Sequence, residues 1–509
     1  MKITGLGHSE LICEMENSKE VNISLLSDAW LSNYAFGDFM ERSPRLNICF
    51  EDFPKLDGIF LSHAHCDHFD PYTLVELYKY QSPDLLIPET LSYLVDILKK
   101  YLPSAKIIIL RDRENFAWKG LNLYGFIFRQ NFLSNEDDVM ILAVNNKKEL
   151  LYIEVDTAIP ESAEAYTEIW DLFHKNNYES VCHIVTRNEL GGIFKSLDAK
   201  TVEERKEKVR NFIETIKEET ELEYVKYEEG YVDYPNLADT KTLVRLFNGQ
   251  GIVYPEDLGT EFDKVMIPLS LIEVRDIEKK IAKKYRKYMP IEALQAGDSF
   301  TITEGRIHAE ACPDFLNNLQ TRDFIFNENA EVFQKETSSK PLRKTLPEGV
   351  TEEYVRSCII DALNNRFLPY QLASLDAPLR ELTLRSPEKK FVIAVRFGNE
   401  DDFHTVYFSY SFAFMRFKVD KVLTKNKGAY NEIYWANDLY DFMQGRQEMF
   451  STFLHHIEKN ISMYFWNCLG MPFIASDFVQ RKMTLHFERA VQGEKVDSYV
   501  KEFFERFTK

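Results

Sequence analysis

Short apolar runs, separated by polar, glycine or proline positions, recur through roughly the first 190 residues. The clearest runs lie at 21–26, 56–62, 85–88, 106–110, 139–144 and 150–155. Runs of this length bounded by turn residues are typical of buried strands. After the second run, Asp70 and Pro71 are a favourable N-cap and first helical residue, so we expect a helix to begin there. Strands that alternate with helices indicate a layered α/β architecture.

The pattern of predicted elements changes near residue 300. Before that point, the charged stretches 202–221 and 272–288 predict solvated helices. After it, three aromatic-rich segments at 390–396, 403–411 and 412–419 predict strands, and helical patterns follow at 431–446, 448–462 and 475–491. We therefore predict two domains, an α/β domain over 1–300 and an α+β accessory domain over 301–509. The aromatic side chains of the second domain either pack its own core or form a lid.

Composition narrows the class of protein. Of the 509 residues, 45% are hydrophobic and 14% aromatic, which excludes disorder as the main state. The net charge of −19 disfavours nucleic acid and anionic membranes as partners, and favours a small-molecule substrate. No apolar segment approaches the ~18 residues of a membrane helix, and no signal peptide is apparent. Seven cysteines without a C-x-x-C pair fit a reducing compartment, so we expect a cytoplasmic location.

One short segment contains most of the candidate metal-binding residues. Residues 62–70 read Ser-His-Ala-His-Cys-Asp-His-Phe-Asp, with the core His63-x-His65-x-Asp67-His68. In an extended segment, alternation puts the first two histidines on one side of the chain. Imidazole and carboxylate are ligands for zinc, iron, manganese and nickel, so the segment predicts a metal site. The alternative is a set of capping and hydrogen-bonding polar residues before the helix.

A strand, then H-x-H-x-D-H, then a helix resembles the metallo-β-lactamase superfamily. The resemblance implies an αββα sandwich with one or two divalent metal ions. It implies that His63 and His65 belong to a first metal group and that Asp67 and His68 belong to a second. Asp156, which follows the run at 150–155, would bridge both groups.

One further aspartate supports this resemblance, whereas two histidines of the superfamily pattern are missing from their expected places. Asp28 follows the run at 21–26, where the superfamily has a carboxylate that orients a metal ligand from behind. The superfamily's histidine before the bridging aspartate is missing, and 130–138 offers only Asn135, Glu136 or Asp137. For the last histidine, the candidates are His183, inside an apolar segment, and Glu189 at its end. Fewer nitrogen ligands leave three possibilities: one metal, a weakly bound pair, or a pair of harder ions such as iron or manganese.

The branch of the superfamily is suggested by weaker matches. Gly7-His8-Ser9 resembles the opening of lactonase-like and phospholipase-D-like members. Segments 248–255 and 293–298 resemble the β-lactamase-like part of the CMP-N-acetylneuraminate hydroxylases. A Rieske centre needs a C-x-H pair followed later by a C-x-x-H pair, and the sequence lacks this combination, so hydroxylation by that electron route is not expected.

Three functions are compatible with these residues. The first is a metal-dependent hydrolase, in which a metal-activated water attacks an ester, lactone or phosphodiester and Asp67 or Asp156 orients the nucleophile. The second is a di-iron, oxygen-activating oxidoreductase, which oxygen-rich ligands favour. The third is a degenerate, non-catalytic member that binds a ligand. Zinc is the first choice of metal, with iron and manganese as alternatives; the substrate and the oligomeric state stay open.

Overall fold

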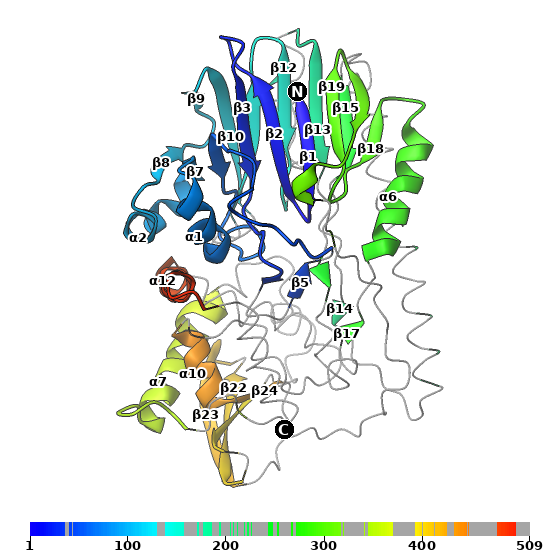
Figure 1. Cartoon of the computed structure of the whole chain (residues 1–509). Helices are drawn as coiled ribbons and strands as arrows, with labels where there is room; N and C mark the ends of the chain where they lie inside the picture. The colour runs from blue at the N-terminus through cyan, green and yellow to red at the C-terminus, as the bar shows by residue number, and fades with distance from the viewer. Residues whose placement is uncertain are drawn as a thin grey trace.

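The computed structural model describes residues 1–35, 40–42, 44–129, 138–156, 177–185, 243–247, 271–316, 345–369, 392–399, 401–411, 413–424, 432–444 and 476–494, with short pieces between them. Two large sheets fill the upper half of the molecule in Figure 1, and a smaller sheet with its helices lies below. Among the described residues, no helix is both long and apolar enough to cross a membrane.

The first large sheet has eight strands, and the histidine-rich segment 62–70 follows one of its interior strands, β6. Its order is β20-β19-β1-β2-β3-β6-β7-β8. The strands from β3 to β8 run parallel, whereas those from β20 to β3 are antiparallel. Their bounds are β1 Lys2–Gly7, β2 Glu10–Glu16, β3 Asn22–Ser27, β6 Gly58–Phe60, β7 Asp84–Pro88, β8 Lys106–Leu110, β19 Ser299–Thr303 and β20 Arg306–Glu310.

The second large sheet has seven strands in the order β18-β15-β13-β12-β11-β10-β9. Strands β9 to β12 form an antiparallel meander, and β12, β13, β15 and β18 are parallel. Their bounds are β9 Asn115–Trp118, β10 Leu121–Arg129, β11 Asp138–Asn145, β12 Glu149–Ile153, β13 Ser180–Val185, β15 Leu243–Phe247 and β18 Ile291–Ala293.

The alternation of side chains along each strand explains why the sheets stack. On β2, Leu11, Cys13 and Met15 enter the core between the two sheets, while Ile12 enters the core on the opposite face. Helices α1 (Pro71–Tyr80) and α2 (Val95–Tyr101) cover that opposite face, with the 3₁₀ turn Glu89–Leu94 between them. Helix α6 (Leu271–Tyr285) packs against the far side of the second sheet (Figure 1). The expected αββα sandwich is therefore confirmed.

The start of α1 agrees with the expectation from sequence. The Asp70 carboxylate accepts hydrogen bonds from the backbone N–H groups of Tyr72 and Thr73, and Pro71 is the first helical residue. The Thr73 hydroxyl donates to the same carboxylate at 2.6 Å and accepts from the N–H of Leu31 at 2.9 Å. The helix cap thus ties down the loop that follows β3.

The C-terminal part has a four-stranded sheet in the order β23-β22-β21-β24. Its strands are β21 Val392–Gly398, β22 Phe403–Ser411, β23 Arg416–Thr424 and β24 Glu432–Trp435, and its helices are α7 Glu352–Ala362, α10 Ala436–Met443 and α12 Ser476–Val491. Tyr410 and Phe417 are buried within this part, and Phe414 is 74% exposed. The boundary at residue 300 stays a prediction; β19 and β20 extend the first sheet to Glu310.

Helix α12 joins the C-terminal part to the sandwich. It packs against α1 and α2, and the Phe487 ring stacks on Tyr101 with 5.3 Å between ring centroids. The two parts share one continuous apolar cluster. The remaining short elements are β4 Tyr34–Ala35, β5 Met40–Arg42, β14 Ile193–Phe194, β16 Ile252–Val253, β17 Met266–Ile267, the 3₁₀ turn Asp314–Leu316 and the π-helical turn Leu363–Phe367.

Candidate metal centre

The histidine-rich segment forms the loop between β6 and α1. Because β3 and β6 are parallel neighbours, the loops after their carboxyl ends meet at the same edge of the sheet. The N–H groups of His68 and Phe69 both donate to the carbonyl of His65, which makes a tight turn. The N–H of Ala29 donates to the carbonyl of His68 at 2.8 Å, so the loop after β3 holds this turn in place.

Two groups of potential metal ligands meet here. His63, His65 and Asp156 form the first, and His8, Asp67 and His68 form the second; within each, the ligand atoms lie within 4.8 Å of one another. His65 and Asp156 are partly exposed, whereas the second group is fully buried. The first group is therefore the less buried of the two.

The two groups are adjacent, and Asp156 lies between them. Its Oδ2 atom is 3.2 Å from Nε2 of His68 and 3.7 Å from Nε2 of His63. The rings of His63 and His68 have centroids 4.3 Å apart. One carboxylate therefore contacts a histidine of each group.

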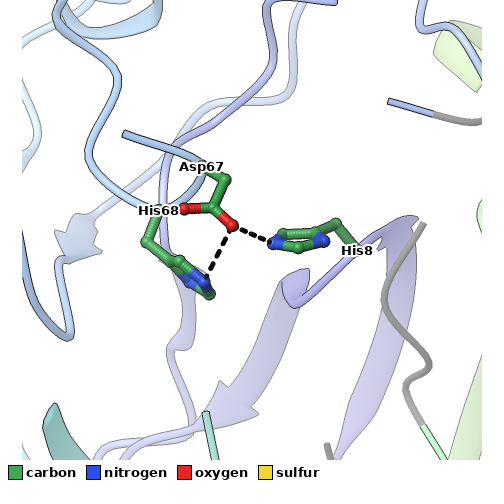
Figure 2. Close-up of side chains that lie close together, drawn as sticks. All are labelled: His8, Asp67 and His68. Atoms are coloured by element: carbon green, nitrogen blue, oxygen red, sulfur yellow. Dashed lines mark hydrogen bonds and ion pairs between the residues drawn. The ribbon is translucent and has the colours of Figure 1, made fainter. Parts of the chain in front are cut away.

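In the second group, the three side chains point toward one another (Figure 2). Oδ2 of Asp67 lies 3.1 Å from Nε2 of His8 and 3.7 Å from Nε2 of His68. His8 is on the turn from β1 to β2, so the first two strands supply a residue to the loop that follows β6.

Asp28 orients the histidines from behind. Its carboxylate accepts hydrogen bonds from the N–H of Ser62 at 2.7 Å and from the Ser62 hydroxyl at 3.0 Å. It also lies 3.0 Å from Nδ1 of His68, and the Ser62 hydroxyl is 2.8 Å from Nδ1 of His63. Because these contacts engage Nδ1, they direct Nε2 of both rings into the centre. Asp28 thus contacts a histidine of the second group directly and one of the first group through Ser62.

The pKa values of His63 and His68 shift in opposite directions. Burial and the neighbouring His68 and His65 hold the pKa of His63 well below its ordinary value, so this ring is neutral. Burial also opposes charge on His68, but Asp156 and Asp67 outweigh it and raise the pKa of His68 well above its ordinary value.

The pKa values of Asp67 and Asp156 depend on the same neighbouring groups. Burial would raise the pKa of Asp67 and of Asp156, but the charge of His68 and the contributions of the neighbouring histidines together outweigh it and lower both. Buried carboxylates around these imidazoles favour a positive charge at the centre, which a bound divalent ion would supply.

The donor set fits a metal ion. Among the buried atoms of the described residues that have no hydrogen-bond partner, Nε2 of His63 and Nε2 of His68 are directed into the centre, and Oδ1 of Asp67 belongs to the second group. Unsatisfied buried polar atoms are costly and rare unless a ligand engages them. Mixed imidazole and carboxylate donors suit zinc, iron and manganese.

Other candidate residues lie elsewhere. His183 is buried on β13 with Nε2 2.9 Å from the Glu154 carboxylate, and it belongs to neither group. Cys66 packs with Trp30 and Ala35. Asn135, Glu136, Asp137 and Glu189 lie outside the described residues.

Sequence reasoning did not assign His8 or Ser9 to the centre. The hydroxyl of Ser9 is 2.9 Å from Nδ1 of His68, and His8 contacts Asp67. The signal was present in Gly7-His8-Ser9, but a lone histidine beside a strand does not reveal which distant loop it meets.

Comparison with known proteins gives distant likenesses only. No family model matches the chain, and no curated protein matches it. Among solved structures, CmlA, a diiron β-hydroxylase from Streptomyces venezuelae, is 16% identical with a TM-score of 0.28 over 37% of this chain and 35% of its own. A CmlA variant is 12% identical with a TM-score of 0.35 over 58% and 52%.

A third solved structure, the metallo-β-lactamase fold protein YhfI from Bacillus subtilis, is 14% identical with a TM-score of 0.24 over 37% of this chain and 70% of its own. The matched region thus spans a third to a half of the CmlA chains.

Proposed function

We propose that this protein is a metal-dependent hydrolase of the metallo-β-lactamase superfamily with a two-metal centre. The observation that carries the proposal is the place of Asp156, whose Oδ2 atom lies within 3.7 Å of both His63 and His68. A carboxylate shared between two groups of ligands is the arrangement that holds two ions close together. His63 and His65 would bind the first ion, and Asp67 and His68 would bind the second.

A bound divalent ion would supply a hydroxide nucleophile at neutral pH and polarise a carbonyl or phosphoryl oxygen. The chain's own residues do the positioning. Asp156 and Asp67 place carboxylate oxygens at the two ligand groups, where they would accept hydrogen bonds from the nucleophilic water and orient it. Asp28 keeps the His68 ring in one orientation through Nδ1.

The substrate class follows from the chemistry of the centre. A small ester, lactone or phosphodiester would approach from the side of His65 and Asp156, the partly exposed members of the first group. A net charge of −19 disfavours an anionic polymer as substrate.

The test is a hydrolysis screen of esters, lactones and phosphodiesters with protein reconstituted with zinc or manganese. We expect turnover that is lost in the Asp156→Asn variant and kept in Asp171→Asn, a control outside both ligand groups. Turnover that survives Asp156→Asn unchanged, or none on any of the three classes, contradicts a hydrolase.

A second candidate is a di-iron, oxygen-activating enzyme. The observation that favours it is that each ligand group contains a carboxylate, Asp67 in one and Asp156 in the other, because oxygen ligands suit iron. Iron near two per chain, with a visible absorption band that oxygen changes, would support this candidate over hydrolysis.

A further inference from the structure

His8 is held in an unusual backbone conformation for a buried residue. Its φ is 54°, in the left-handed region, and its side chain is 1% exposed. The pairing of β1 with β2 shifts register between Gly5 and Gly7, which turns the chain toward the centre. A left-handed conformation is unfavourable for a residue other than glycine, so it persists only where its surroundings enforce it.

A buried arginine enforces this turn. Nη2 of Arg42 donates to the carbonyls of Leu6 and Gly7 at 3.1 and 2.8 Å, and to the Glu10 carboxylate at 2.8 Å. The same guanidinium lies 5.0 Å from the centre of the Trp30 ring. These contacts hold the backbone that precedes His8 and the side chain of Glu10 that follows it.

The imidazole itself is directed at Asp67. The edge of the Trp30 ring supports it at 5.1 Å between centroids, and its Nε2 lies 3.1 Å from Oδ2 of Asp67. Protein ligands lie about 2.0–2.2 Å from zinc, so two donors that share one ion lie roughly 3–3.6 Å apart. The spacing between His8 and Asp67 is within that range, and His68 is only slightly farther at 3.7 Å (Figure 2).

We propose that His8 is the third protein ligand of the second metal group, with Asp67 and His68, for a divalent ion such as zinc, iron or manganese. This inference rests on the proposed function in one respect, that the centre binds metal. It accounts for the nitrogen donor that the second group otherwise lacks. Among the described residues, His183 is engaged by Glu154 and takes no part in either group.

The competing role for His8 is a hydrogen-bond donor that only positions Asp67. The two roles predict different metal stoichiometries. His8→Ala removes both the ligand and the donor, whereas His8→Gln keeps an amide N–H that reaches Asp67 and removes the imidazole. His308→Ala, on β20 with an exposed side chain, is the matched control.

The experiment titrates metal-free protein with Zn²⁺ by calorimetry, and then measures retained zinc after desalting. We expect two ions for the wild type and for His308→Ala, and one ion for both His8→Ala and His8→Gln. Free imidazole, which can occupy the space left by the ring, restores the second ion in His8→Ala. Circular dichroism confirms that each variant is folded.

Two ions of unchanged affinity in His8→Ala overturn the inference, as do two ions in His8→Gln. A wild type that binds no metal overturns both this inference and the proposed function. If the wild type binds two ions, His8→Ala binds one, and no ester, lactone or phosphodiester is hydrolysed, the proposed hydrolase fails while the role of His8 stands.

Discussion

Replacing Asp28 with asparagine tests whether this buried carboxylate organises the centre. Asparagine has the same shape and tolerates the left-handed conformation of residue 28, whose φ is 57°. Its amide oxygen can still accept from the N–H of Ser62. Its amide nitrogen, however, cannot accept from the Ser62 hydroxyl and Nδ1 of His68, which both lie 3.0 Å from Oδ2 of Asp28.

The magnitude follows from these contacts. Losing one charge-assisted hydrogen bond costs about 1.5–3 kcal/mol. At about 2–4 °C per kcal/mol, the thermal midpoint of the metal-free protein falls by about 3–12 °C. The His68 ring loses its fixed tautomer, so metal affinity drops about 10–100-fold, as for other residues that support a ligand from behind.

The assay is differential scanning fluorimetry of the metal-free protein, followed by zinc titration with a competing chelator. Asp57→Asn is the control, because the Asp57 carboxylate also accepts a backbone N–H, that of Ser24 at 3.1 Å, but is away from the centre. We expect this control to bind zinc like the wild type. An Asp28→Asn protein with wild-type zinc affinity and midpoint would refute the role given to Asp28.

Two further predictions concern charge and packing. The pKa of His68 is raised above its ordinary value of 6.5, so the stability it contributes is fully present below about pH 6.5 and is lost as pH rises through the folded-state pKa. The thermal midpoint of the metal-free protein should therefore fall above that pH, and less steeply in Asp156→Asn; a steeper fall in the variant contradicts the assignment. Phe487→Ala should cost about 3–5 kcal/mol and expose α12 to limited proteolysis, because the ring is fully buried against α1 and α2. Phe414→Ala, at a side chain that is 74% exposed, should change stability by less than about 0.5 kcal/mol, and equal effects of the two would contradict the docking of α12.

Local signals predicted the parts of the molecule that depend on neighbours in sequence. The helix start at Asp70 and Pro71 depends on contacts within three residues, and the structure confirms it. The strands around the histidine-rich loop were also predicted, because continuous apolar runs are needed where both faces of a strand are buried. Asp28 and Asp156 were found because each directly follows such a run.

Contacts between distant segments could not be predicted in this way. His8 meets Asp67 across 59 positions, and Arg42 reaches Glu10 across 32. Helix α12 packs on α1, about four hundred residues earlier in the chain, through aromatic rings whose partners no local pattern reveals. His183 illustrates the converse, because its place after Asp156 in the chain made it a candidate for the superfamily's last histidine, whereas in the structure its Nε2 lies 2.9 Å from the buried Glu154 carboxylate.

The most direct test of the central claim is the metal content of the protein. Wild type purified without added metal, and after reconstitution, is analysed by inductively coupled plasma mass spectrometry beside the His63→Ala/His65→Ala double variant and the His308→Ala control. The account predicts two ions per chain in the wild type and the control, and a loss of at least one in the double variant. No bound metal in the reconstituted wild type, or equal metal in the double variant, would contradict it.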